Sequence, residues 1–158
     1  MKTIDIYTDS SSTHNYGIGI LMVGYDGLKT TFEETYQFST NGDILRSEYN
    51  LPKSRSKTSD GELYAIYKAL EILDNPNNVK VNLYTDSLLS ATKIYGISKS
   101  KSPFEKVMVP KINDLLKSKN AEVMWIKAHC GNWGNEIVDE LTKKAKYGDK
   151  YIPNYKKL

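Results

Sequence analysis

Apolar and polar residues alternate along four stretches of the chain, and this period of two is typical of β-strands. Strands are therefore predicted over residues 3–9, 16–38, 79–85 and 121–127. The longest stretch holds two strands joined at Asp26-Gly27, because Asp-Gly between alternating runs is a strong signal for a hairpin turn. Residues 39–57 contain turn residues without a sustained period, so we expect a long loop of the kind that is usually functional or mobile.

The remaining stretches predict helices. Leu63, Ile66, Leu70 and Leu73 recur at helical spacing in the first of them, and helices are predicted over residues 58–74, 87–96, 103–119 and 135–146. The order of elements is then β-β-β-α-β-α-α-β-α. The first three strands form an antiparallel meander, whereas strands that alternate with helices pair in parallel. The sequence thus predicts an α/β fold with a mixed five-stranded sheet and helices on both faces.

The composition is that of one globular domain with a sizeable core: 158 residues, 39% hydrophobic and 26% charged. No apolar run approaches the ~18 residues that a membrane span requires, and the N-terminus runs directly into a strand pattern rather than a signal peptide. Cys130 is the single cysteine, which excludes an intramolecular disulfide and favours a reducing compartment. We expect a cytoplasmic monomer without membrane association.

Charge is distributed unevenly along the chain. Residues 93–119 carry seven Lys against two acids, residues 143–158 carry six Lys against one, and residues 1–38 balance to −3. An acidic body with basic appendages suggests a polyanionic partner held near a carboxylate cluster. The alternative interpretation is that these lysines form ordinary solvated faces.

The tetrapeptide Tyr-Thr-Asp-Ser occurs twice, 77 residues apart, and each copy ends a predicted strand. The period of two places Asp9 and Asp86 on corresponding faces, at the C-terminal ends of their strands. If the two strands are parallel neighbours, the two carboxylates lie side by side at the sheet edge where ligands of α/β proteins usually bind. Alternatively, each Asp merely caps the turn or helix that follows it.

Two adjacent unpaired carboxylates repel each other, so either one stays protonated or a cation lies between them. Oxygen ligands without clustered His or Cys indicate Mg²⁺ or Mn²⁺ rather than Zn²⁺. Glu62 and Asp139 stand near the starts of predicted helices and fit the same site. Either acid could instead simply complement its helix dipole.

The chain resembles the type 1 ribonuclease H family at this point. Asp9, Glu62, Asp86 and Asp139 match that family's four metal-binding acids in order. The segment WIKAHCGNWGNEIVDELTKKA (125–145) matches the family's strand, histidine loop and final helix, with His129 ten residues before Asp139. The resemblance covers residues 3–146 and implies a ribonuclease H-like catalytic domain over residues 1–146, followed by a basic tail at 147–158.

The resemblance implies an endoribonuclease that hydrolyses the RNA strand of RNA–DNA hybrids with two Mg²⁺ ions, for which Mn²⁺ can substitute, and leaves 5′-phosphomonoesters. Asp9 would bridge both metals, Asp139 would serve the metal that activates water, and Glu62 and Asp86 would serve the metal at the leaving oxygen. His129 would assist proton transfer or product release. The catalytic residues are then Asp9, Glu62, Asp86, His129 and Asp139.

Substrate contacts are expected next to these acids. The candidates are Ser10, Ser56, Lys57, Thr58, Ser59 and Asn135, of which Asn135 is equally well placed as a helix N-cap. The chain departs from the family at Ser10, where Gly is common, and at Ser59-Asp60-Gly61, where less acidic residues are usual. Its basic handle is also reduced, to residues 96–106. These departures concern strand contacts rather than the metal site.

Three other functions compete with this interpretation. A non-catalytic nucleic-acid-binding module gains nothing from clustered negative charge, so the four acids speak against it. A related metal-dependent DNA nuclease, such as a 3′ exonuclease, is disfavoured by His129 and its surrounding sequence. A cysteine hydrolase using Cys130 is remote, because no strand-to-helix nucleophile turn surrounds that residue.

Overall fold

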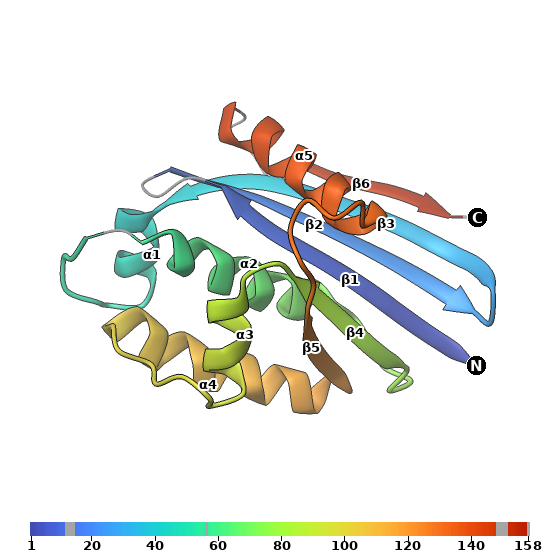
Figure 1. Ribbon diagram of the computed structural model, residues 1–158, viewed down its shortest axis with the longest axis horizontal. Helices are drawn as coiled ribbons and strands as arrows, with labels where there is room; N and C mark the ends of the chain where they lie inside the picture. Colours follow the sequence, from blue (N-terminus) through green and yellow to red (C-terminus); the bar gives the residue numbers. More distant parts are fainter. Residues whose placement is uncertain (12–14, 56, 148–151, 158) are drawn as a thin grey trace.

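The computed structural model describes residues 1–11, 15–55, 57–147 and 152–157. Its centre is a mixed sheet with the strand order β5-β4-β1-β2-β3-β6. Helices lie on the sheet's two faces, and the chain's two ends lie at the same end of the molecule (Figure 1). The predicted α/β architecture, with five strands and helices on both faces, is confirmed, and one further strand is added to it.

The first three strands form the predicted meander. They are β1 (Lys2–Ser11), β2 (Asn15–Asp26) and β3 (Lys29–Asn41), which pair antiparallel. Gly27 makes the hairpin turn with φ +64°, a left-handed conformation that glycine adopts without steric cost. β4 (Lys80–Thr85) then pairs with β1 in parallel, and β5 (Ala121–Trp125) pairs with β4 in parallel.

Two apolar cores lie on opposite faces of the sheet. The larger core lies under α2 (Thr58–Ile72), α3 (Leu88–Ile94) and α4 (Pro103–Ser118), with Ile18 and Ile20 of β2 pointing into it. The smaller core lies under α5 (Trp133–Tyr147), where Leu21 and Val23 of the same strand meet Val138. Strand β2 therefore alternates between two buried faces, which explains its long apolar run.

Helix α5 lies unusually close to the sheet at Gly19 of β2. A Cβ atom on Gly19 would stand 2.6 Å from the backbone oxygen of Val138 and 3.0 Å from Cβ of Leu141. Only a residue without a side chain permits this approach. The contact fixes the height of α5, and therefore of Asp139, above the sheet.

The structure corrects two expectations about the connecting segments. Residues 39–57 are not a continuous loop: β3 continues to Asn41, whose side chain accepts a hydrogen bond from the Ile44 N–H and caps the short helix α1 (Gly42–Glu48). Seven residues are too few to show a helical period, so the sequence looked irregular. The structure also places β6 (Ile152–Lys157), in the segment expected to be a tail, antiparallel to the edge of β3.

Among the described residues, none of the helices combines the length and the apolar character that crossing a membrane requires.

Candidate active site

The two Tyr-Thr-Asp-Ser copies lie side by side in the sheet. Parallel pairing of β1 and β4 sets Tyr7 opposite Tyr84 and Thr8 opposite Thr85. The two tyrosine rings stack with their centroids 5.0 Å apart and an angle of 20° between their planes. The spacing of 77 residues between the copies is thus the register of the strand pair, and it carries Asp9 and Asp86 to one edge of the sheet.

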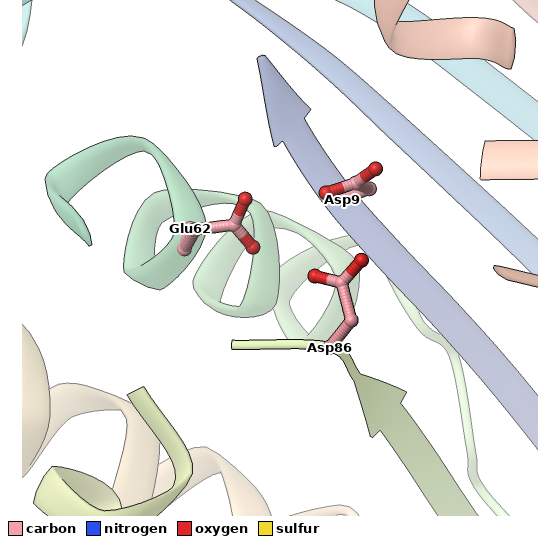
Figure 2. A group of neighbouring side chains, drawn as sticks. All are labelled: Asp9, Glu62 and Asp86. Atoms are coloured by element: carbon pink, nitrogen blue, oxygen red, sulfur yellow. The ribbon is translucent and has the colours of Figure 1, made fainter. Parts of the chain in front are cut away.

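Helix α2 brings a third carboxylate to the same edge. Asp9, Glu62 and Asp86 each contribute a carboxylate oxygen, and these atoms all lie within 4.8 Å of one another. Figure 2 shows the three side chains converging from the end of β1, the first turns of α2 and the end of β4. The fold thus brings these three acids together, as their positions in the sequence predict.

The backbone of Ser10 ties two of these acids together. Its N–H donates to Asp9 Oδ1 at 2.8 Å and to Glu62 Oε1 at 3.2 Å. Glu62 is 7% exposed, and its other oxygen, Oε2, has no hydrogen-bond partner among the described residues. A buried carboxylate oxygen without a partner is costly, so this atom is well suited to bind a ligand.

The close packing of the acids disfavours their charged forms. Burial, with the charges of Asp86 and Asp139, raises the pKa of Asp9 to about 7. Burial and the charges of Asp9 and Asp86 raise the pKa of Glu62 well above its ordinary value. Burial also raises the pKa of Asp86, although a hydrogen bond from the Asn135 side chain opposes this rise.

These observations fit a divalent cation. Three clustered carboxylates, one with a buried unpartnered oxygen, supply the hard oxygen ligands that Mg²⁺ and Mn²⁺ prefer. No His or Cys belongs to this group of acids. A bound cation would favour the charged forms of all three acids and offset the burial and the repulsion that raise their pKa values.

Asp139 lies near this group but outside it. Its carboxylate pairs with Lys143 at 3.2 Å, one turn further along α5, and its charge raises the pKa values of both Asp9 and Asp86. Asp139 therefore faces the three acids from α5 without belonging to the group whose oxygens lie within 4.8 Å. The geometry gives it a peripheral position beside a three-acid centre.

The loop before α5 holds the other predicted residues. His129 is exposed, adopts a positive φ of 55°, and is near enough to Asp86 to influence the pKa of that acid. Asn135 is 4% exposed and its side chain hydrogen-bonds Asp86. The N-cap interpretation of Asn135 is wrong, because Asn132 caps this turn by accepting the Asn135 N–H at 2.9 Å.

Known proteins resemble this chain in sequence and in fold. A sequence profile of the family described as RNase H matches residues 1–147. The chain belongs to the RNase H family. A curated relative, Ribonuclease H of Pseudoalteromonas translucida (strain TAC 125), is 28% identical over 158 residues, which cover 91% of this chain and 90% of the relative.

Solved RNase H1 structures share the fold. The enzyme of the halophilic archaeon Halobacterium salinarum NRC-1 superposes with a TM-score of 0.68 at 18% identity, covering 90% of this chain and 96% of that one. LC11-RNase H1, solved in complex with an RNA/DNA hybrid, superposes with a TM-score of 0.61 at 21% identity, covering 90% and 98%.

The predicted substrate residues of this RNase H family member lie around α2, with two exceptions. Ser10 is 8% exposed beside Glu62, and Lys57 is the N-cap residue that precedes Thr58 and Ser59 in the first turn of α2. Asn135 lies on α5, and Ser56 lies outside the described residues. Their contacts with a substrate stay predictions.

Sequence reasoning missed a cavity beside these residues. The cavity has a volume of about 240 Å³ and lies where the connection between α1 and α2 meets the start of α4; its lining includes Arg46, Arg55, Lys57, Asp60, Ser102 and Phe104. A cluster of basic residues in residues 53–57 was the only signal in the sequence, and Arg46 and Ser102 join it only through the tertiary fold.

Proposed function

We propose that this chain hydrolyses the RNA strand of RNA–DNA hybrids, using two Mg²⁺ ions for which Mn²⁺ can substitute. The observation that carries the proposal is the convergence of Asp9, Glu62 and Asp86 in a member of the RNase H family. The complex of LC11-RNase H1 with an RNA/DNA hybrid, on the same fold, supports the hybrid as substrate. Hydrolysis would leave a 5′-phosphate on the RNA product.

The chain's own residues would hold and orient the reacting groups. Asp9, Glu62 and Asp86 would bind the metals, with Asp139 as a fourth ligand from α5 after release from Lys143. Bound divalent cations lower the pKa of water and stabilise the charge on the leaving oxygen. The Ser10 N–H fixes the carboxylates of Asp9 and Glu62 relative to each other.

Asp86, at the end of β4, and His129, on the loop before α5, would act together in proton transfer. The Asn135 hydrogen bond restrains the Asp86 carboxylate, and the Trp125 indole donates to the Asp86 carbonyl oxygen at 3.2 Å. His129 is exposed on its loop, so it can carry a proton between solvent and the reacting phosphate. We expect an assisting role for it, because the nucleophile would be a water molecule activated by the metals that the carboxylates hold.

A non-catalytic binding module on the same fold is the second candidate, and the site's electrostatics disfavour it. Burial, with the negative charges of neighbouring acids, raises the pKa values of all three carboxylates, so keeping them charged without a cation costs stability. A module that only binds a polyanion would gain from replacing these acids. A monomeric state and a cytoplasmic location stay predictions from the sequence.

The test is incubation of the full chain with labelled RNA–DNA hybrid, duplex DNA and duplex RNA, with Mg²⁺ or with EDTA. We expect cleavage of the RNA strand of the hybrid only when Mg²⁺ is present, with 5′-phosphate products. Cleavage of duplex DNA in preference to the hybrid would establish the DNA nuclease instead. Tight binding of the hybrid without cleavage in Mg²⁺ or Mn²⁺ would establish the binding module.

A further inference from the structure

Two stacked tyrosine rings lie directly behind two of the metal-binding acids. Tyr7 and Tyr84 face each other across the parallel pair of β1 and β4, with ring centroids 5.0 Å apart and 20° between the ring planes. Tyr7 stands two residues before Asp9 in β1, and residues two apart in a strand lie on the same face. Tyr84 stands two residues before Asp86, at the end of β4. The stack is therefore built on the two strands that carry these acids.

The first turn of α5 rests on this stack through Gly134. A Cβ atom on Gly134 would stand 2.5 Å from Cδ1, Cε1 and Cε2 of Tyr7, which are atoms from both sides of the ring. The backbone of Gly134 therefore lies over the face of the ring, at a distance that only a residue without a side chain permits. Glycine is otherwise unfavourable inside a helix, so this close approach explains why it is the second residue of α5.

The contact at Gly134 leads back to the metal-binding acids. Asn135 is the next residue of α5; it is 4% exposed, and its side chain hydrogen-bonds Asp86. Since Asp86 follows Tyr84 closely, the contacts form a closed circuit. The circuit runs from β4 to Tyr7 on β1, from Tyr7 to the start of α5, and from there to the end of β4. Each contact in such a circuit restrains the others, which holds a functional side chain in one orientation.

The path of the chain before α5 makes this anchor important. β5 is an edge strand and α5 packs on β2, so the segment between them crosses β4 and β1 (Figure 1). Residues 126–133, which include His129, are all exposed or half-buried. Gly134 and Asn135 are the first buried residues after the crossing. The ring of Tyr7 and the carboxylate of Asp86 are thus the points at which the crossing segment is fixed to the sheet.

We propose that the ring of Tyr7, supported by Tyr84, is a positioning platform for the start of α5, which sets the height of Asn135 and so the orientation of the Asp86 carboxylate. The role belongs to the ring rather than to the hydroxyl, because Gly134 meets ring carbons. The effect on cleavage rests on the proposed function, whereas the effect on the hydrogen bond between Asn135 and Asp86 is measurable without metal or substrate. Groups that orient a metal ligand are typically worth about 10–100-fold in metal affinity or activity.

NMR of the metal-free, isotope-labelled full chain tests the geometry. The side-chain amide signal of Asn135, identified by its loss in Asn135→Ala, reports the hydrogen bond to Asp86. Gly134→Ala sets a methyl group against the Tyr7 ring and should shift this signal and speed the exchange of its protons with water. Tyr7→Val removes the ring carbons that meet Gly134, keeps a residue suited to a strand, and should have the same effect. Tyr7→Phe keeps the ring and should leave the signal unchanged.

Gly24→Ala is the matched control. A Cβ atom on Gly24 would stand 2.2 Å from Cε1 of Phe32, so this change overpacks a contact of the same kind between a glycine and an aromatic ring. Gly24 pairs with Ile4 of β1, five residues before Asp9. The control should lower stability and leave both the Asn135 signal and the cleavage rate of the folded protein unchanged.

Single-turnover cleavage of the hybrid, at saturating substrate and Mg²⁺, gives the functional effect. Gly134→Ala and Tyr7→Val should each slow cleavage about 10–100-fold, and Tyr7→Phe should restore the rate. The double variant of Tyr7→Val with Gly134→Ala should lose no more than the slower single variant, because both changes act through one contact. Losses that multiply in the double variant would show that the two residues act separately and would overturn the platform.

The NMR comparison decides the proposal independently of cleavage. An Asn135 signal that stays unchanged in both Gly134→Ala and Tyr7→Val would refute the positioning role, and so would a change in Tyr7→Phe as large as that in Tyr7→Val. If Gly134→Ala does not fold, the two Tyr7 variants decide alone. A signal that shifts as expected in a chain that cleaves no hybrid would support the platform and contradict only the proposed function.

Discussion

The Ser10 hydroxyl occupies the space that a side chain on residue 61 would need. A Cβ atom on Gly61 would lie 2.3 Å from Ser10 Oγ and 2.6 Å from the ring of Tyr16. The first turn of α2 can therefore lie directly against β1, where Glu62 receives the Ser10 N–H at 3.2 Å. The two departures from the usual family pattern, at Ser10 and before Glu62, are in contact with each other.

Gly61→Ala should lower both stability and cleavage. The new methyl group overpacks the contact with Ser10 and Tyr16, which typically lowers the free energy of unfolding by ~1–3 kcal/mol, and it moves Glu62 away from Asp9. The better helix propensity of alanine offsets up to ~1 kcal/mol of this loss. Adding Ser10→Gly should restore part of the loss, with Ser10→Gly alone as control. Urea unfolding and single-turnover rates measure the two effects; additive losses in the double variant would show that the residues do not compete for space.

Asp9→Asn should abolish cleavage while the fold stays intact, because a neutral amide cannot replace a carboxylate between cations. Glu62→Gln and Asp86→Asn should lose at least ~100-fold, the scale of single electrostatic groups in catalysis. Asp5→Asn is the matched control, since Asp5 lies on the same face of β1 and bonds Asn82 instead. Turnover in Mg²⁺ is the measurement, and an active, folded Asp9→Asn variant would refute the metal site.

The metal-free protein should lose stability between about pH 4 and pH 7 through Asp9. Its pKa is about 7 in the fold against 3.8 as the ordinary value, so the folded state binds the proton more tightly. The stabilisation by the proton on Asp9 is complete below the ordinary pKa of 3.8 and is lost as pH rises through the folded-state pKa of about 7.

Asp9→Asn should remove this dependence. The quantity to compare is the free energy of unfolding of the variant minus that of the unmodified chain, measured in EDTA. This difference should be about 2–3 kcal/mol larger at pH 8 than at pH 5, since each pKa unit is worth ~1.4 kcal/mol. Urea titrations at the two pH values measure it. Added Mg²⁺ should reduce the difference at pH 8 by stabilising the unmodified chain. A constant difference across pH would contradict the raised pKa.

His129→Ala should slow cleavage by ~10²–10⁴-fold without abolishing it, the usual range for acid–base assistance. The residue is exposed on a loop and does not belong to the group of three acids. Single-turnover rates separate chemistry from product release. A loss as complete as that of Asp9→Asn would give His129 a central role.

The basic residues before α2 should contribute to hybrid affinity. Lys53, Arg55 and Lys57 lie in the connection that leads directly into the helix carrying Glu62. Each phosphate contact changes the salt dependence by roughly 0.9 on B-form DNA, so neutralising all three should flatten the slope by about two to three units. Saturated turnover should change little.

Neutralising Lys2, Lys29 and Lys80 together provides the control. These three lysines lie at one end of the sheet, because Lys2 pairs with Asp26, Asp26 pairs with Lys29, and Thr3 pairs with Lys80. That end of the sheet is opposite the C-terminal strand ends that carry Asp9 and Asp86. Binding titrations at several salt concentrations, in Ca²⁺ to block cleavage, measure the slopes. Equal slopes for the two triple variants would leave residues 53–57 without a specific role.

The repeated tetrapeptide shows which features of the site the sequence alone predicted. Alternation of residues put Asp9 and Asp86 at strand ends, and the interleaved helices favoured parallel strands, but only the structure shows that the two copies lie on neighbouring strands. The helical period likewise predicted the buried side of α2, including Leu63 and Ile66. Periodicity is a local signal, and these features depend on little else.

Tertiary structure decided what no local pattern contains. The short helix α1 and the edge strand β6 depend on a cap and on a partner strand, so their own sequences carry weak signals. The sequence left Asn135 equally suited to a substrate contact and to a helix N-cap, and the structure gives the cap to Asn132, because several polar residues in one loop suit the same function. The contact of Ser10 with Gly61, and the meeting of Arg46 and Ser102 at one cavity, arise only when distant segments pack together, since spatial proximity is a property of the folded chain.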